Sequence, residues 1–545
     1  MLVARALVLL LALLMAVRTL RTRSIEIRRT PLDLPLAALI LSAALSAALA
    51  ENRALSIFGA YGRDEGLLTA VTYVALFWLG AQFLHNAGEA RRLLRWLLAG
   101  GYIVAMLGIA QTLLGSALGV PRQETAFTFA GTVRAASSLG NPNALGALIA
   151  MLLPPALWEL GQARTATDRL LALNCAITLL CALILTFSRS AWLGAALGAG
   201  VLASGMLARS ATRRQGQATV AALAIAIVAI VAITLLPSTG QVAARLASLA
   251  DPGSGSAATR LHIWHDSLSL IAHRPLTGYG PDSFGLVYPR FQTGDWTGGP
   301  LIDKAHSDLV QLAATQGMLG VAAFLWLVAA VLRSFWRGRH VAGTVALLGG
   351  WISYQVTVQV NFSYLPAAAS SWLFLAVAAA TWTEGQSRVW TPGLPGHVAK
   401  RAAITTGAFS LLLVFPALVA PFLADTAYLK AQGVWHASDA DAARRDIAMA
   451  RLLAPGESTY AAYAGDMALD LDGSGQPGPQ AHLDDAREAY RTAARLGTFD
   501  PAVYRHLALA DVRLGRRAEA RAAAAEALSL GPFDSRNRSL LEQLR

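Results

Sequence analysis

Three basic side chains are the leading candidates for chemistry. Arg189 lies between two apolar stretches with almost no loop, and Arg260 lies in a segment with helical spacing. His306 comes just before a long apolar run that starts near Leu309. Guanidinium groups at a helix start favour phosphate, and a neutral imidazole can accept a proton from an attacking hydroxyl. These residue types favour a phosphate-binding site beside a general base.

Each of these residues also has a structural interpretation. Arg189 is then an interfacial arginine whose side chain reaches the lipid headgroups, and Arg260 is a solvated residue on an interfacial helix. His306 is then a hydrogen-bonded interfacial histidine. Against this, the dipole of the helix that follows His306 disfavours an imidazolium. From spacing alone, both interpretations stay open for all three residues.

Further polar residues are expected to line a groove around these three. They are Asn143, Tyr279, Arg290 and Lys304. His262 and His265 are about one helical turn apart, but no third ligand has convincing spacing and no H-E-x-x-H motif is present. We therefore expect no metal and no cofactor. The sequence also lacks a P-loop, which argues against nucleotide-driven transport.

The elements that must position these residues are membrane helices. The 545 residues are 55% hydrophobic and only 14% charged, whereas soluble domains are about 25% charged. Apolar spans of about 17–25 residues are transmembrane candidates. The sequence therefore predicts an all-α polytopic membrane protein of about 12 transmembrane helices. The spans are roughly 3–20, 31–50, 66–84, 93–114, 141–160, 170–186, 190–207, 218–236, 317–333, 342–361, 366–383 and 402–424.

Arginine-rich loops alternate with arginine-poor loops along the chain, which predicts that the arginine-rich set is cytoplasmic. Both termini and the long polar segment 237–316 then lie outside. This segment holds four of the ten histidines, and we interpret it as folded and functional. Within it, Ser256–Ala272 has helical spacing, with an apolar face predicted at Leu261, Trp264, Leu268 and Ile271.

Residues 425–545 differ in character from the rest of the chain. They hold 15 of the 45 basic and 17 of the 33 acidic residues, so the net charge of +12 belongs to the membrane part rather than to a nucleic-acid site. Residues 503–534 predict two paired helices joined by a turn at Leu514-Gly515, which is typical of a tetratricopeptide repeat. A generic helical bundle is the alternative. Such repeats bind protein partners in a groove.

Several motifs resemble one family when taken in order. The chain is similar to the O-antigen ligase family, which also contains O-antigen polymerases and protein O-oligosaccharyltransferases. The resemblance covers roughly residues 50–385, although Ser307 stands where many members have Asn. The motifs are Gly140-Asn141-Pro142-Asn143, Thr186-Phe187-Ser188-Arg189-Ser190, Arg260-Leu261-His262-Ile263-Trp264, Arg274-Pro275-Leu276-Thr277-Gly278 and Ala305-His306-Ser307-Asp308.

The resemblance implies a GT-C-type membrane glycosyltransferase that takes a glycan from undecaprenyl diphosphate on the outer face of the bacterial inner membrane. Arg189 and Arg260 would bind the donor diphosphate, and His306 would be the base or would orient the acceptor. No metal is implied. The acceptor would be lipid A-core, a glycan or a protein. Two arginines suit this chemistry because they stabilise the charge that develops on the leaving diphosphate.

The sequence thus predicts a transmembrane ligase-like domain at 1–424, with its catalytic loop at 237–316, and a periplasmic helical-repeat domain at 425–545. Within the family, a ligase, a polymerase and a protein glycosylase remain open. A transporter or flippase for lipid-linked glycan is the alternative from another class, but it would need polar residues deep in the spans and an internal repeat. A membrane-anchored scaffold would leave the outer arginines unexplained.

Overall fold

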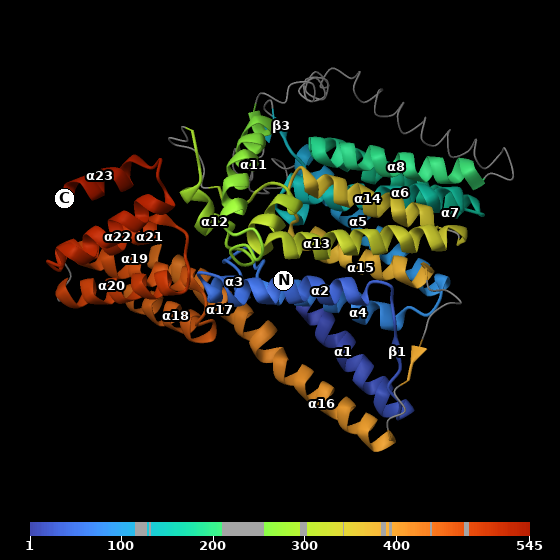
Figure 1. Cartoon of the computed structure of the whole chain (residues 1–545), viewed down its shortest axis with the longest axis horizontal. Helices are drawn as coiled ribbons and strands as arrows, with labels where there is room; N and C mark the ends of the chain where they lie inside the picture. Colours follow the sequence, from blue (N-terminus) through green and yellow to red (C-terminus); the bar gives the residue numbers. More distant parts are fainter. Residues whose placement is uncertain are drawn as a thin grey trace.

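The computed structural model of the chain is built almost wholly of helices (Figure 1). Its strands form two short antiparallel pairs, β1 (Ile27–Arg28) with β4 (Val389–Trp390) and β2 (Thr128–Phe129) with β3 (Thr132–Val133). The prediction of an all-α protein is therefore confirmed. The structure describes residues 1–114, 128–129, 132–209, 255–294, 302–341, 343–382, 389–391, 395–436, 439–473 and 479–545.

Within these described residues, eight helices are long and apolar enough to cross a bilayer. They make the chain a polytopic membrane protein, as the sequence predicts. Seven of these are α1 (Leu2–Thr22), α5 (Ala87–Leu114), α6 (Pro142–Gly161), α7 (Ala166–Leu185), α8 (Arg189–Arg209), α13 (Asp308–Arg337) and α15 (Leu365–Trp382). The eighth is a continuous rod of α16 (Gly396–Val414), η6 (Phe415–Val419) and α17 (Ala420–His436).

Shorter apolar helices complete the bundle. They are α2 (Asp33–Ala48), α4 (Leu67–Phe83) and α14 (Thr344–Gln359). Every predicted span except one coincides with a helix. The exception, 218–236, lies outside the described residues, so the total of twelve spans stays a prediction.

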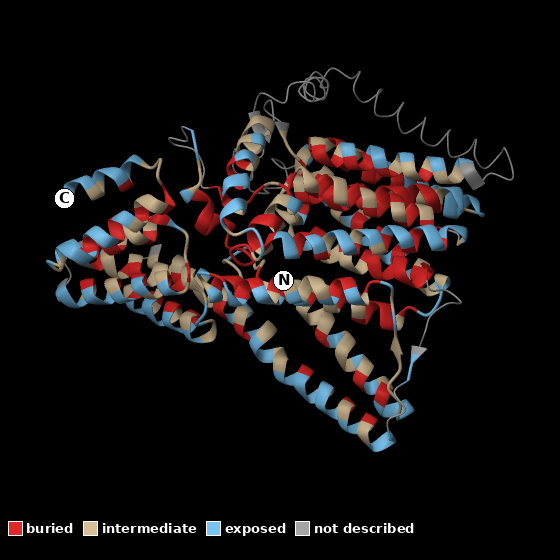
Figure 2. Ribbon diagram, in the orientation of Figure 1, coloured by how far each residue is buried: buried red, intermediate tan, exposed pale blue. Residues whose placement is uncertain are grey.

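The centre of the membrane part is α6, whose residues are almost all buried (Figure 2). It packs against α5, α7, α8 and α14. Beside it, α8 and α14 approach each other backbone to backbone at Gly198 and Gly349, where an added methyl group would collide with the facing helix. Small residues at such a contact let membrane helices pack by van der Waals contact, because lipid gives them no hydrophobic driving force.

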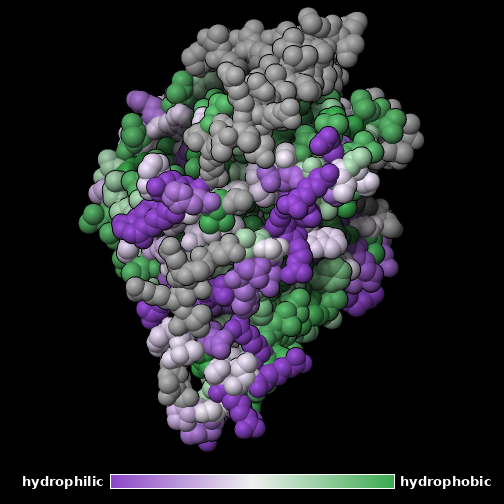
Figure 3. Space-filling view, turned by 90° about the vertical axis from the view of Figure 1, so that its right-hand side faces the viewer, coloured by the Kyte–Doolittle hydropathy of each residue, from purple (hydrophilic) through white to green (hydrophobic). Residues whose placement is uncertain are grey.

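One end of the bundle gathers the arginine-rich loops. Arg91 and Arg95 at the start of α5 both pair with Glu159 at the end of α6, at 2.6 and 3.0 Å. Arg28 Nη1 donates to the carbonyl of Leu84 at 2.9 Å. A view onto this end shows hydrophilic residues across it and hydrophobic residues on the flanks (Figure 3). This grouping is the pattern that the positive-inside rule predicts for a cytoplasmic face.

The opposite end carries a second, smaller core outside the spans. It is built by α3 (Arg53–Phe58), α11 (Gly255–His273), α12 (Phe284–Val287), η4 (Tyr288–Arg290) and the segment before α13. The N-terminal part of α13 is offset from the rest at Gly317, which has a left-handed φ of 65°. There the amide of Met318 donates to the carbonyl of Pro275 at 2.7 Å. This contact ties the α11 segment to the spanning helix.

The predicted helix Ser256–Ala272 exists as α11. Of its predicted apolar stripe, Leu261 and Leu268 are 49% and 66% exposed, whereas Ile271 packs against the second core. The most deeply buried face holds Ile263 and Leu270 together with two polar residues, Asp266 and Ser267. This mixed face has no apolar periodicity, so the sequence did not single it out.

The tail consists of consecutive helices that pack in chain order (Figure 1). The helices α21 and α22 are joined at Leu514–Arg516, where the sequence predicts a turn, and Arg487 of α20 pairs with the buried Asp511 of α21 at 2.5 Å. The assignment to the tetratricopeptide class stays a prediction. The tail helices are α18 (Ala440–Leu453), α19 (Ser458–Gly473), α20 (Pro479–Arg495), α21 (Pro501–Arg513), α22 (Arg517–Leu530) and α23 (Ser535–Gln543).

Candidate active site

His306 lies in the short loop that enters α13. Its backbone has a left-handed φ of 53°, which is uncommon for a residue with a side chain. The flanking residues hold it there. The carbonyl of Ala305 accepts from the indole of Trp264 on α11 at 2.8 Å, and its amide donates to Gln311 at 2.8 Å. A sparsely populated conformation that its surroundings impose is typical of functional positions.

The His306 ring is half-buried, and its Nδ1 atom is fully buried. That atom makes no hydrogen bond within the described part of the chain. Burial, together with the positive charges of Arg260 and Lys304, lowers the pKa of His306 to about 4. The sequence attributes a neutral imidazole to the helix dipole, but burial is the largest cause. A neutral imidazole has the form that a proton acceptor needs.

The two arginines singled out by the sequence come together at this end of the bundle. Arg189 is the first residue of α8 and Arg260 lies on α11. The pKa of Arg260 is lowered, first by burial and then by the positive charge of Arg189. Beside Arg189, the hydroxyl oxygens of Ser188 and Ser190 are 3.2 Å apart and buried. Two cations held close together with His306 nearby create a strongly positive, partly dry site that suits an anion.

Arg134 is a site residue that the sequence did not single out. Its Nε donates to the carbonyl of Thr186 at 2.7 Å, and its Nη2 donates to Asn143 Oδ1 at 3.1 Å. Asn143 in turn shares a hydrogen bond with the side chain of Tyr364, and burial raises the pKa of that phenol. Arg134 thereby links the start of α6 to the turn that carries Arg189. Its one signal in the sequence is that it is among the few arginines on the outer side.

The segment before α15 forms an aromatic wall beside His306. The rings of His306 and Phe362 meet edge to face at 5.1 Å, and Phe362 and Tyr364 are 4.4 Å apart. Asn361 is buried, and its Oδ1 makes no hydrogen bond to any described residue. Burial of a polar atom without a partner costs about 1–3 kcal/mol. This cost identifies Asn361 as a group to be satisfied by something outside the described chain.

Lys304 lies on the other side of His306, at the centre of an ion-pair network. It is buried and pairs with Glu65, and its Nζ lies 5.6 Å from the centre of the Phe362 ring. Burial, together with the positive charge of Arg63, lowers the pKa of Lys304 to about 7. Arg63 itself pairs with Asp303. The sequence identified Lys304 but missed Arg63 and Glu65, because their partners are far away in the chain.

Tyr279 and Arg290 belong to a second cluster. Arg274 lies over the Tyr279 ring at 4.7 Å, and both Arg274 and Arg290 pair with Glu51, at 3.5 and 2.8 Å. Among the described residues, no contact joins these two predicted groove residues to His306 or to the Arg189–Arg260 pair. Their place in the groove stays a prediction.

The two histidines with one-turn spacing have other partners. His262 Nε2 lies 2.8 Å from the carbonyl of Thr293, and the side chain of His265 is 77% exposed. Asp266, between them in space, accepts from Thr293 and from Tyr288. These contacts fix the segment after α11 against that helix.

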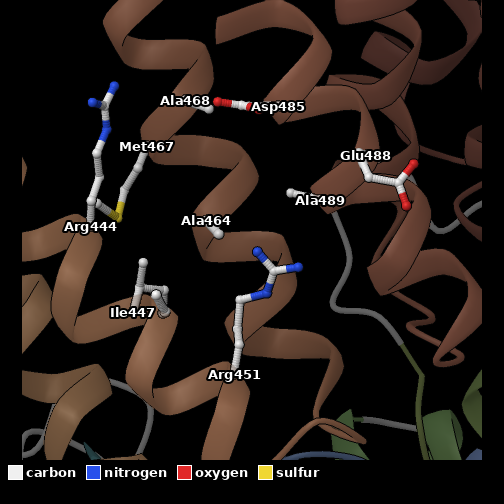
Figure 4. A pocket seen from close by; sticks show the side chains of 10 residues that line it. Arg444, Ile447, Arg451, Ala464, Met467, Ala468, Asp485, Glu488 and Ala489 are labelled. Carbon is white, nitrogen blue, oxygen red and sulfur yellow. The ribbon is translucent and has the colours of Figure 1, made fainter. Parts of the chain in front are cut away.

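The tail holds a hollow of its own, of about 330 Å³. Arg444 and Arg451 of α18 stand on one side of it, and Asp485 and Glu488 of α20 stand on the other, with Met467 between them (Figure 4). Its basic and acidic residues thus face each other across the hollow. That the tail binds a protein partner in this groove stays a proposal.

Comparison with known proteins bears on part of the membrane domain. Residues 175–325 match the family model described as O-antigen ligase. These residues form an O-antigen ligase-like domain. No curated protein matches the chain. One matching solved structure is the crystal structure of the APC/C hetero-tetramer Cut9-Hcn1, at 14% identity over 86% of this chain and 89% of that chain. Its TM-score of 0.19 is too low to support an argument.

The O-antigen ligase-like domain contains much of the site. Arg189, Arg260, Lys304 and His306 all fall within residues 175–325. Asn143 and the aromatic wall lie outside the matched range, and the packing of the helices brings them to the site. The domain, together with the membrane helices, supports glycosyltransferase chemistry in polysaccharide biosynthesis.

Proposed function

We propose that the chain transfers a glycan from undecaprenyl diphosphate to a hydroxyl acceptor on the outer face of the bacterial inner membrane. One observation carries the proposal. Two guanidinium groups on separate helices, Arg189 and Arg260, lie near a half-buried neutral imidazole, His306. The two guanidinium groups suit the binding of a diphosphate, and the imidazole suits the removal of a proton from a hydroxyl nucleophile. The O-antigen ligase-like domain supports this assignment of substrates.

The reaction follows from these roles. The acceptor hydroxyl gives its proton to the neutral imidazole of His306 as its oxygen attacks the anomeric carbon of the donor sugar. The bond between that carbon and the diphosphate oxygen breaks, and its electron pair leaves with the diphosphate. Arg189 and Arg260 stabilise the charge that develops on the leaving oxygens. Attack opposite the leaving group inverts the anomeric carbon.

The place of the site in the bundle supports an outer-face reaction. His306, Arg189 and Arg260 lie at the end opposite the arginine-rich loops, and by the positive-inside rule that end faces away from the cytoplasm. The same orientation makes residues 425–545 a periplasmic domain. A lipid-linked donor then approaches from the outer leaflet, where its diphosphate is at the level of the site.

The proposal is tested by a transfer assay with purified protein. Undecaprenyl-diphosphate glycan is supplied with lipid A-core, with a second lipid-linked glycan, or with acceptor proteins, one at a time. We expect undecaprenyl diphosphate to be released together with one glycosylated acceptor, which separates a ligase, a polymerase and a protein glycosylase. Movement of donor across liposomes without transfer to any acceptor would indicate a transporter and overturn the proposal.

A further inference from the structure

A second cavity, of about 140 Å³, lies where the tail meets the outer end of the membrane domain. It is walled on one side by the turn after α3, including Tyr61. On the other side it is walled by the residues that start α19 and α21. Figure 1 shows α3 beside the tail at the junction with α17. The residues that matter here are Tyr61, Glu457, Ser458, Thr459, Thr498 and Phe499.

The size of the cavity limits the ligand. Drug-sized molecules occupy pockets of about 300–1,000 Å³. A cavity of about 150 Å³ is known to accept a single six-membered ring such as benzene. The cavity between tail and membrane domain therefore fits one ring at a time.

The lining of the cavity limits the ligand further. Two aromatic side chains, Tyr61 and Phe499, supply apolar surface. The polar lining residues are four that carry hydroxyl groups, namely Tyr61, Ser458, Thr459 and Thr498, and two that carry carboxyl groups, namely Glu457 and Asp500. A sugar ring has the same division, with apolar C–H groups on its face and hydroxyl groups around its edge. Protein hydroxyls both donate and accept, so they match sugar hydroxyls in either role. A flat apolar ring would leave these polar groups without partners, which is unfavourable.

The carboxyl of Glu457 adds to this match. Its Oε1 accepts from the amide of Thr459 at 3.1 Å, which fixes its orientation. Burial, together with the negative charges of Asp64 and Asp425, raises the pKa of Glu457 to about 7. Near neutral pH this group therefore both donates and accepts hydrogen bonds, as a sugar hydroxyl requires.

The cavity is connected to the candidate active site through Arg63. This guanidinium lies 4.8 Å from the centre of the Phe499 ring and pairs with Asp303. Asp303 precedes His306 by three residues, a span of at most about 11 Å of extended chain. The cavity is thus within the reach of an oligosaccharide whose reacting end is at His306.

We propose that this cavity is a saccharide subsite that binds one ring of the glycan substrate away from the reacting sugar. The proposal rests on the transferase function and assigns a substrate-binding role to the junction between tail and membrane domain. The ring belongs either to the donor glycan or to a glycan acceptor, and the experiment separates the two.

Three variants of the full chain test the subsite. Glu457→Gln keeps the shape and loses the carboxyl, and Ser458→Trp fills the cavity. Glu519→Gln is the matched control, because it changes an exposed carboxyl of the same tail that lines neither hollow. Thermal unfolding of each variant shows that the tail is still folded. Transfer kinetics are then measured with each substrate varied in turn, and saturation-transfer NMR detects binding of the free oligosaccharide.

We expect Glu457→Gln to raise the KM for one substrate about five- to twentyfold with little change in kcat, since one hydrogen bond of uniform binding is lost. Ser458→Trp should abolish the NMR transfer signal, and Glu519→Gln should change neither the KM nor the NMR signal. If the KM rises for the donor alone, the ring belongs to the donor glycan. If the KM rises for the acceptor alone, the ring belongs to the acceptor. If both cavity variants transfer glycan with unchanged KM and kcat and give unchanged NMR signals, the proposed subsite is contradicted, while the proposed transferase function is not. If the wild type transfers nothing, the proposed function fails, and the NMR comparison alone decides whether the cavity binds a saccharide.

Discussion

The positive charge of Arg189, at the start of α8, acts on Arg260 of α11 and lowers its pKa. Like charges on separate elements repel each other, so the fold maintains this approach at a cost in stability. Such an arrangement is typical of a site whose ligand supplies the opposite charge. A diphosphate carries that charge, and its binding would relieve the repulsion.

This relationship predicts how the two arginines respond to substitution. Arg189→Ala and Arg260→Ala should each weaken donor binding about 10- to 100-fold, since a hydrogen bond to a charged group contributes about 1.5–3 kcal/mol. Binding of undecaprenyl diphosphate in detergent measures this effect, and thermal unfolding shows that each variant is folded. Equal donor affinity in all three proteins would show that the arginines do not contact the diphosphate.

Arginine and lysine should not be interchangeable in this pair. Arg260→Lys keeps the charge but loses the planar fork that binds two phosphate oxygens at once. We expect Arg260→Lys to recover only part of the donor affinity lost in Arg260→Ala. An affinity equal to that of the wild type would show that charge alone matters at this position.

The pH dependence of transfer follows from the lowered pKa of His306. The ring must be neutral to accept a proton, and its pKa in the folded protein is about 4 against an unperturbed value of about 6.5. The value of kcat/KM, which reports the free enzyme, should therefore be flat through pH 6.5 and fall only as the pH approaches 4. Folding stability should also fall as pH drops from about 6.5 to 4, because only the unfolded chain binds the proton easily there. A fall in kcat/KM centred near pH 6.5 would contradict the half-buried, neutral ring.

The pair of Lys304 and Glu65 should be important for stability, with an asymmetry between its members. The Lys304 side chain is 3% exposed and that of Glu65 is 27% exposed. Glu65→Ala leaves a buried ammonium without its partner and should cost about 3 kcal/mol. Lys304→Met leaves a carboxylate that can still reach water, so it should cost less. The exposed pair of Arg495 and Glu488 is the control, and Glu488→Ala should cost no more than about 1 kcal/mol. Thermal or denaturant unfolding measures these losses of stability. If Glu65→Ala costs no more than Glu488→Ala, the buried ion-pair network is contradicted.

Arg134 should act on the site without touching the reacting atoms. Its bonds to Thr186 and Asn143 position the turn before Arg189. Arg134→Ala should lower kcat/KM about tenfold through loss of this positioning, and Arg134→Lys should recover less than half of the loss on a logarithmic scale. Unchanged kinetics would show that the turn is held by its other contacts.

The sequence predicted the membrane helices well, because long apolar runs have one stable arrangement in a bilayer. It also selected Arg189, Arg260 and His306, which the structure brings to one end of the bundle. Charge type and position alone left a structural interpretation open for each of them, and the family resemblance favoured the site. The buried face of α11 was not singled out, because Asp266 and Ser267 are buried through hydrogen bonds that periodicity does not detect.

The network around the site could not be predicted from local sequence. Glu65 pairs with Lys304, and Arg63 pairs with Asp303, across more than two hundred residues of chain. Only the packing of α3 and its following turn against the loop before α13 brings them together. The left-handed backbone of Gly317, which allows α13 to pass close to Leu276 and Thr277, is likewise set by tertiary contact.

The central claim is that His306 takes the proton of the acceptor, and one comparison tests it most directly. Single-turnover transfer is measured with donor and acceptor saturating, for the wild type, for His306→Ala and for His265→Ala, whose exposed ring is the matched control. The account predicts that His306→Ala slows the chemical step about 10²- to 10⁴-fold with donor affinity kept, while His265→Ala transfers at the wild-type rate. A His306→Ala variant that is folded, binds donor and transfers at the wild-type rate would contradict the account.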